Sequence, residues 1–297
     1  MNPGWRDAAA LTRPRQWPIL SAQLAVGFLL AAPGREVAAA ALGAPWTVAA
    51  AWAAWVVMLN GGTLAYNSAW DRDTGPVAYL ARPPQPPRWL AGGALAAMAA
   101  GAVLGFMAVS PAFGHVTAAC VLLSVLYSHP ASRWKSRPGL DLLVNMAGYG
   151  GGTTLAGLLA ARAAGVAQAP ADGARLVAGF ALLFGSLYPL TQIYQAEDDR
   201  RRGDRTLATA LGGRRALGAA GLLGLGAALL LAGIPAAGAG RTAVSGAVAL
   251  WLLHLAWWFV RGARWDAARQ HRGMQHALVL WAAVDAALVA AHLAGGP

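Results

Sequence analysis

Several features that most globular proteins share are scarce in this chain of 297 residues. It has a single cysteine, Cys120, and only 12% charged residues, whereas a soluble domain carries about 25%. One cysteine excludes an internal disulfide and a cysteine metal cluster. The sequence also lacks a Walker loop, a G-x-G-x-x-G fingerprint and a recognisable Ser/His/Asp arrangement, which argues against the nucleotide-binding and hydrolase classes that depend on them.

What the chain has instead is long apolar runs. Hydrophobic residues make up 57% of it, and the mean hydropathy is +0.47. Most runs approach the ~20 residues that cross a bilayer as a helix, and they lack the alternation of barrel strands. We therefore predict an all-α polytopic membrane protein, a single domain over residues 1–297 with a central cavity whose polar mouth is cytoplasmic. The nine predicted transmembrane helices are 17–32, 38–64, 89–109, 113–128, 142–161, 176–194, 216–238, 243–260 and 274–294.

The net charge of +11 follows the predicted topology. With nine spans, 19 of the 23 basic residues fall on the side of the N-terminus and of the loops after spans two, four, six and eight. Because positive residues are retained in the cytoplasm, we expect those segments to be cytoplasmic and the C-terminus to lie on the opposite side. The expected location is a prokaryotic inner membrane. The excess of basic residues is then explained by the topology and by attraction to lipid headgroups. We expect a lipid bilayer as partner and no nucleic acid.

Half of the 12 acidic residues lie in two short stretches on this cytoplasmic side. The first, YNSAWDRDTG, follows the second span, and the second, YQAEDDRRRGD, follows the sixth. If each helix continues into its stretch, Asn67 and Asp71 share one helix face, and so do Gln195 and Asp199. Two such helix-to-acid units indicate a weak internal repeat with both clusters facing one cavity.

Carboxylate and amide oxygens are hard ligands, and Mg²⁺ is typically bound by one or two carboxylates, waters and substrate phosphates. Arginines in the same loops can form bidentate pairs with phosphate oxygens. The candidate metal ligands are Asn67, Asp71, Asp73, Gln195, Glu197, Asp198 and Asp199. The candidate diphosphate-binding arginines are Arg72, Arg201, Arg202 and Arg205. The alternative is that these loops only face water and that their acids cap helices or pair with neighbouring arginines.

These residues resemble the UbiA superfamily of intramembrane prenyltransferases, which have nine transmembrane helices and aspartate-rich motifs after helices two and six. The stretch N-S-A-W-D-R-D-T-G is similar to the family's first motif, N-D-x-x-D-x-x-x-D. The stretch QAEDDRRRGDRTLATALG is similar to its second, and RPRQWPIL to its first-helix lead-in. The sequence departs from the pattern at Ser68, Gly75 and Gln195, where the family has aspartates.

The resemblance implies Mg²⁺-dependent transfer of an isoprenoid chain from an allylic prenyl diphosphate to a lipophilic acceptor. The catalytic residues would be Asp71, Asp199, Tyr127 and Lys135. The stretch LYSHPASRWKSRPGLD would place Tyr127 and Lys135 near the diphosphate, with Lys135 also binding it. Two alternatives stay open: a UbiA-like terpene cyclase that acts on a prenyl diphosphate, and a non-catalytic lipid-binding or transport protein. In the predicted fifth span, the run GYGGGTT favours close helix packing, with a backbone-lined pocket wall as the alternative.

Overall fold

The structure is a computed structural model. It describes residues 3–73, 75, 77, 80, 82–167, 171–234, 238–262 and 265–294. Within these residues the only β pairing is an isolated antiparallel bridge between Val77 and Leu80. The predicted all-α class is confirmed for the part of the chain that is described.

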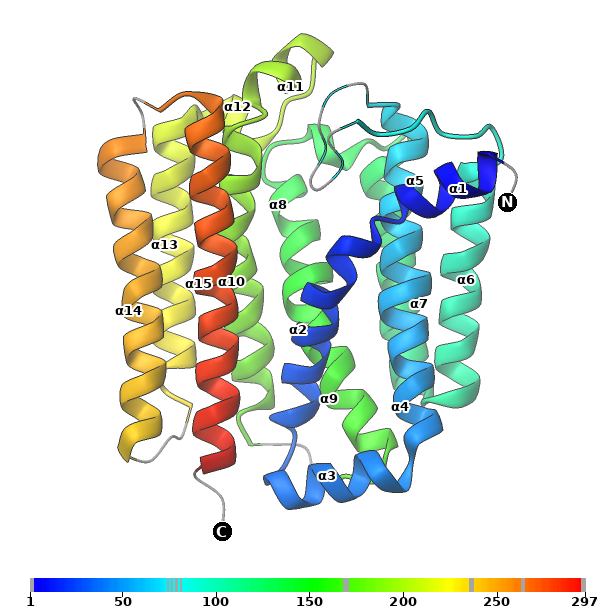
Figure 1. The fold of residues 1–297 in the computed structure, drawn as a ribbon, viewed down its shortest axis with the longest axis vertical. Helices are drawn as coiled ribbons and strands as arrows, with labels where there is room; N and C mark the ends of the chain where they lie inside the picture. Colours follow the sequence, from blue (N-terminus) through cyan, green and yellow to red (C-terminus); the bar gives the residue numbers. More distant parts are fainter. Residues whose placement is uncertain are drawn as a thin grey trace. The chain divides into compact units, whose positions relative to one another are not determined.

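Helices follow one another along the chain, joined mostly by short connections (Figure 1). Up to residue 128 they are α1 (Pro3–Leu11), η1 (Pro14–Gln16), α2 (Trp17–Leu29), α3 (Gly34–Gly43), α4 (Pro45–Trp52), η2 (Ala53–Asn60), α5 (Gly61–Asp71), α6 (Leu90–Ala108) and α7 (Pro111–Ser128). Beyond it they are η3 (Trp134–Ser136), α8 (Leu140–Asn145), η4 (Met146–Gly152), α9 (Thr153–Ala163), α10 (Gly173–Ile193), α11 (Ala196–Arg202), α12 (Leu207–Leu211), α13 (Gly213–Leu231), α14 (Gly238–Arg261) and α15 (Ala267–Ala294). Two of these, η2 and η4, are π-helical and lie inside longer helical runs.

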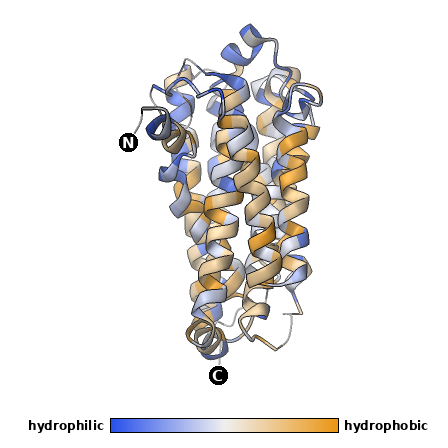
Figure 2. Ribbon diagram, turned by 90° about the vertical axis from the view of Figure 1, so that its right-hand side faces the viewer, coloured by the Kyte–Doolittle hydropathy of each residue, from blue (hydrophilic) through white to orange (hydrophobic). Residues whose placement is uncertain are grey.

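Seven of the described helical segments are long and apolar enough to cross a membrane, or up to eight if a bent pair counts as one span. Hydrophilic residues collect toward the ends of the helices and hydrophobic ones along them (Figure 2). Large apolar side chains also point outward, with Trp46 85% and Met107 82% exposed, as expected of lipid-facing positions. The sequence predicted nine spans, and seven or eight described segments pass this test. The predicted fifth span is helical over 140–163 but is not one of the seven.

The bent pair explains most of the difference at the N-terminal end. The helical segment that includes α2 stops at Leu29, and α3 leaves it at an angle of 114°. A new helix then begins at Pro45, whose fixed φ and missing N–H suit the first turn of a helix. The second span consequently covers Pro45–Asp71 rather than the predicted 38–64, and it includes the first acidic motif in its last turns.

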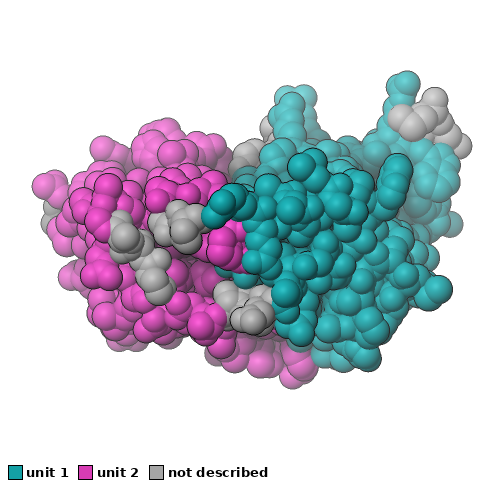
Figure 3. Space-filling model, turned by 90° about the horizontal axis from the view of Figure 1, so that it is seen from below, with its two compact units in different colours: residues 1–31, 35–133, 156–169 teal, residues 32–34, 134–155, 170–297 magenta. Residues whose placement is uncertain are grey.

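Contacts along the chain define two compact units, which Figure 3 colours separately. Unit 1 comprises residues 1–31, 35–133 and 156–169, and unit 2 comprises residues 32–34, 134–155 and 170–297. The first motif and Tyr127 belong to unit 1, whereas Lys135 and the second motif belong to unit 2. The candidate residues are therefore described unit by unit.

Candidate functional site

The first motif lies at the end of a regular helix. Asn67 and Asp71 both belong to α5, so the prediction that they share one helix face is confirmed. The helix ends directly after Asp71 because Arg72 adopts the left-handed conformation (φ 49°), and its N–H reaches the Ser68 carbonyl at 3.1 Å. Arg72 is exposed there, while Asn67 and Asp71 are half-buried.

Side chains from two other segments of unit 1 contact this motif. Ser128 on α7 donates a hydrogen bond to Asn67 Oδ1 at 3.0 Å, and Tyr127 is the residue before it. Arg13, which is buried, donates from Nη2 to Ser68 Oγ at 3.3 Å. Ser68, which stands where the family has an aspartate, thus contacts an arginine from the first-helix lead-in.

A small hollow lies beside the motif within unit 1. Its polar lining consists of Arg13, Ser68 and Asp73, and prolines 83, 84 and 86 contribute to its apolar lining. Asp73 is half-buried and Gly75 is exposed, while Thr74 and Pro76 lie outside the described residues. The hollow is thus lined by one carboxylate, from Asp73, and one guanidinium, from Arg13.

The second motif begins a new helix, which corrects one prediction. The helix of the sixth predicted span was expected to continue through Gln195 and Asp199, but α10 ends at Ile193. A tight turn follows, in which the Gln195 N–H bonds to the Gln192 carbonyl at 3.0 Å, and Gln195 then starts α11. Asp199 N–H still bonds to the Gln195 carbonyl at 2.9 Å, so the i, i+4 relation between these two residues holds within α11.

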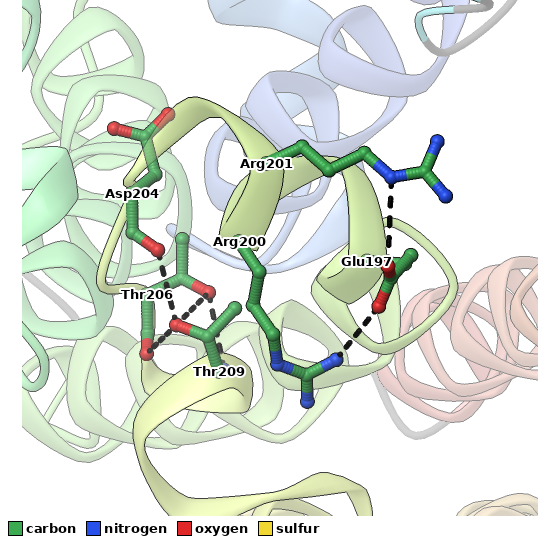
Figure 4. A network of polar contacts seen from close by, with 6 residues as sticks. All are labelled: Glu197, Arg200, Arg201, Asp204, Thr206 and Thr209. Carbon is green, nitrogen blue, oxygen red and sulfur yellow. Dashed lines mark hydrogen bonds and ion pairs between the residues drawn. The ribbon is translucent and has the colours of Figure 1, made fainter.

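The acids of the second motif have different surroundings, and Figure 4 shows those of Glu197. Glu197 is exposed and pairs with Arg200 at 3.4 Å and with Arg201 at 3.5 Å. Asp198 is also exposed, whereas Asp199 is only 5% exposed. The pairing of Glu197 with its own helix matches the alternative interpretation that some acids of these loops pair with neighbouring arginines.

Asp199 faces the chain that follows its own helix. Thr206 Oγ1 donates to Asp199 Oδ2 at 3.4 Å, and the same hydroxyl caps α12 by accepting the Thr209 N–H at 3.3 Å. The turn between them depends on Gly203, whose φ of 77° suits glycine. Arg205 is exposed in this turn, and the side chain of Arg202 is outside the described part.

The segment that carries Lys135 lies against the second motif within unit 2. Lys135 is buried in η3, and the next residue, Ser136, donates a hydrogen bond to the Asp204 carboxylate. Both residues are therefore near the turn that follows Asp199. The sequence predicted Lys135 as a diphosphate ligand, and the contact through Ser136 is the feature that brings its segment to the second motif.

Sequence reasoning missed the residue that organises this region, Asp141, which was treated as a scattered acid. Its side chain is fully buried at the start of α8. Oδ1 accepts the N–H groups of Gly139 and Leu142, each at 2.8 Å. Oδ2 accepts from Gln192 Nε2 at 2.8 Å and from the Leu207 N–H at 2.9 Å. An aspartate in the first turn of an otherwise apolar span was the available signal, because buried charges in membrane helices are costly.

The carboxylate and amide oxygens of the two motifs suit a magnesium ion whose coordination is completed by other ligands. No group of three or more histidine, cysteine, aspartate or glutamate side chains is arranged to hold a metal within the described ranges. Mg²⁺ needs only one or two carboxylates, because waters and substrate phosphates complete its octahedron. Asp71 with Asn67, and Asp199, supply that kind of ligand.

Comparisons with known proteins agree with this architecture. The profile of the UbiA prenyltransferase family matches residues 22–280. A UbiA homologue from Archaeoglobus fulgidus, solved with DMAPP and Mg²⁺, aligns with 94% of this chain and 99% of its own at 20% identity and a TM-score of 0.63. A digeranylgeranylglyceryl phosphate synthase aligns with 98% of this chain and 99% of its own at 13% identity and a TM-score of 0.72.

An apo UbiA homologue from Aeropyrum pernix aligns with 91% of this chain and 97% of its own at 19% identity and a TM-score of 0.60. At these identities the likeness shows a shared fold. No curated protein sequence matches the chain.

Proposed function

The chain belongs to the UbiA prenyltransferase family, and we propose that it transfers an isoprenoid chain from an allylic prenyl diphosphate to a lipophilic acceptor within the membrane. The proposal includes dependence on Mg²⁺, cytoplasmic acidic motifs and an inner-membrane location. Family membership over most of the chain supports it, together with the Archaeoglobus fulgidus homologue that was solved with DMAPP and Mg²⁺. The one observation that carries it furthest is the buried Asp199, whose turn contacts the Lys135 segment through Ser136 and Asp204.

In this proposal Asp71 and Asp199 are the principal metal-binding carboxylates. Asn67 and Gln195 add amide oxygens, and Asp73, Glu197 and Asp198 are the remaining candidate ligands. When bound, Mg²⁺ neutralises charge on the diphosphate and lowers the barrier to its departure. Glu197 is the weakest candidate, because binding a metal would require it to leave two arginines.

The cationic side chains bind the diphosphate as it leaves. The bond that breaks joins the allylic carbon to a diphosphate oxygen, and the electron pair goes to that oxygen. Arg72, Arg205 and Lys135 stabilise the developing negative charge, as do Arg201 and Arg202. Tyr127 lies beside Ser128, which contacts the first motif, and is proposed to hydrogen-bond the diphosphate. The acceptor then forms the new bond to the allylic carbon and loses a proton.

Labelled prenyl diphosphates of several chain lengths test the proposal. Purified protein in lipid, supplied with a membrane lipid extract, is expected to release diphosphate with Mg²⁺ and not with EDTA. Asp71→Ala and Asp199→Ala are each expected to abolish release. A labelled product that contains an acceptor supports transfer, whereas a cyclic hydrocarbon or alcohol supports a cyclase. Absence of release at every chain length contradicts both enzymatic functions.

A further inference from the structure

One polar side chain in unit 1 is buried without partners. Asn60 is 5% exposed, and neither its Nδ2 nor its Oδ1 has a hydrogen-bond partner within the described residues. It belongs to the second span, Pro45–Asp71, deep inside an apolar helix. Because a buried unpaired amide destabilises a fold, its presence requires an explanation such as a ligand or an ordered water.

The local backbone gives a second, independent sign of function. Asn60 is the last residue of η2, a π-helical segment of eight residues. Runs of π-helix are rare and frequently occur at functional sites, because the added residue changes which side chains face inward. The regular helix α5 starts at the next residue, so helix geometry can be applied from Asn60 onward.

That geometry aligns Asn60 with the first motif. Asn67 and Asp71 follow it by seven and eleven residues, close to two and three complete turns, so all three lie on one face. At 1.5 Å per residue, Asn60 lies roughly 10 Å from Asn67 along the helix axis and about 16 Å from Asp71. The unpaired amide is therefore on the metal-binding face of the helix, deeper in the membrane.

Neighbouring polar groups between this span and α7 have partners, which singles Asn60 out. Thr63 Oγ1 and Ser124 Oγ are 2.8 Å apart, and Ser128 donates to Asn67. Thr117, deeper on α7, donates to the Phe113 carbonyl at 2.8 Å. Polar side chains in this part of unit 1 are thus paired above and below the level of Asn60. The unpaired state of Asn60 is not a general feature of the region.

We propose that Asn60 binds a neutral hydroxyl group of the lipophilic acceptor. This inference rests on the proposed function and extends it to the class of acceptor. The Asn60 carboxamide has an unpaired donor and an unpaired acceptor. A group that can both accept and donate a hydrogen bond satisfies them, and a hydroxyl is the smallest such group. The group is neutral because residues 45–66 contain no charged side chain and α7 carries none apart from the distant His115.

The depth of Asn60 suits an acceptor rather than the diphosphate. A metal–oxygen bond takes about 2 Å, and the reacting carbon and its nucleophile are about 3 Å apart. The diphosphate adds its own length between the metal and the allylic carbon. An acceptor that reacts at this carbon therefore extends to the level of Asn60. An acceptor oxygen bound there fixes the orientation of the reacting atom, which accelerates the reaction through positioning.

Binding without turnover tests this inference separately from the proposed function. Thermal unfolding of the full-length protein in detergent is followed without Mg²⁺ or prenyl diphosphate, in the presence of a long-chain alkylphenol, a monoalkylglycerol, or the methyl ether of each. We expect at least one hydroxyl compound to raise the melting temperature of the wild type more than its ether does. The phenol and glycerol arms distinguish an aromatic from an aliphatic acceptor. In Asn60→Leu the hydroxyl preference should disappear, with affinity about tenfold weaker.

The stability of the variants without ligand provides the matched control. Asn60→Leu should melt at or above the wild-type temperature, because it removes an unpaired amide. Asn145→Leu, also a buried asparagine in a helix, should melt lower, because Asn145 Nδ2 donates to the Asp141 carbonyl at 2.8 Å. Asn60→Ala gives the same comparison of ligands if the leucine variant does not fold.

Two results would overturn the inference. One is a wild type that does not distinguish either hydroxyl compound from its ether, and the other is an Asn60→Leu protein that keeps the preference. Both would mean that the Asn60 amide binds only water. Diphosphate release from geranyl diphosphate with Mg²⁺, measured on the same wild-type preparation, reports the proposed function by itself. Release together with a failed binding test therefore rejects the role of Asn60 alone.

Discussion

The Asp141 carboxylate and the Gln192 carboxamide together hold the start of α12. Gln192 Nε2 donates to Asp141 Oδ2 at 2.8 Å, and the two side chains accept the N–H groups of Leu207 and Ala208, respectively. Residues 193–206, which include the second motif, therefore begin and end at one hydrogen-bonded cluster. Asp141 is a positioning residue for that motif, because its Oδ2 contacts Gln192 and Leu207, which lie on either side of the motif.

Replacing Asp141 tests this positioning role. In Asp141→Ala four donors lose their acceptor, and two of them, Gln192 Nε2 and the Leu207 N–H, are buried, so we expect a loss of about 3–5 kcal/mol in the free energy of unfolding. Asp141→Asn keeps a carbonyl oxygen and should fold with a smaller loss. In that variant the KM for the prenyl diphosphate should rise several-fold while the affinity for the acceptor is unchanged. An equal change in both would indicate a purely structural role.

The hydrogen bond from Ser128 to Asn67 should affect metal binding. Its O–H donates to Asn67 Oδ1 and orients the carboxamide that is proposed to bind the metal. Ser128→Ala is expected to raise the Mg²⁺ concentration for half-maximal diphosphate release about tenfold. The matched control is Ser124→Ala on the same helix, whose hydroxyl contacts Thr63 instead. If both variants shift the Mg²⁺ dependence equally, helix packing rather than orientation of Asn67 is responsible.

The acids of the second motif should differ in importance according to their burial. Asp199→Asn is expected to lower the rate of diphosphate release about 100-fold or more, because it removes a buried candidate ligand. Glu197→Gln removes only exposed ion pairs with Arg200 and Arg201, which contribute about 0–1 kcal/mol to stability. Its rate should stay within a few-fold of the wild type. The reverse order of effects would assign the metal to Glu197.

Glycine packing in the helix of residues 140–163 gives a prediction about stability alone. A Cβ on Gly150 would lie 2.7 Å from the Phe180 carbonyl oxygen, whereas a Cβ on Gly148 would meet no described atom within 4 Å. Gly150→Ala should therefore cost about 1–3 kcal/mol. Gly148→Ala should change stability by less than about 1 kcal/mol. Melting temperatures of both variants in one detergent check this, and equal values would contradict close packing at Gly150.

The sequence predicted best what depends on neighbours along the chain. Apolar runs placed the long helices with ends up to seven residues from those observed, and the spacing of Asn67 and Asp71 placed both on one face of α5. The interpretation of GYGGGTT as a packing surface is confirmed at Gly150, which lies against α10. The expected continuous helix through Gln195 was wrong, because the turn at Gln192–Gln195 is made by a backbone hydrogen bond that apolar periodicity does not reveal.

The sequence by itself determined that this chain is helical, apolar along its helices and equipped with two acidic motifs, because helix formation and partition into lipid follow from local composition. Only the tertiary structure decided which polar residues meet. Asp141 reaches Gln192 and Leu207 across 51 and 66 residues, and Glu197 is paired at the surface while Asp199 is buried. In the sequence, Asn60 is a polar residue that follows an apolar run. Its lack of partners became visible only with the helices packed, because hydrogen-bond satisfaction depends on what the fold brings within about 3 Å.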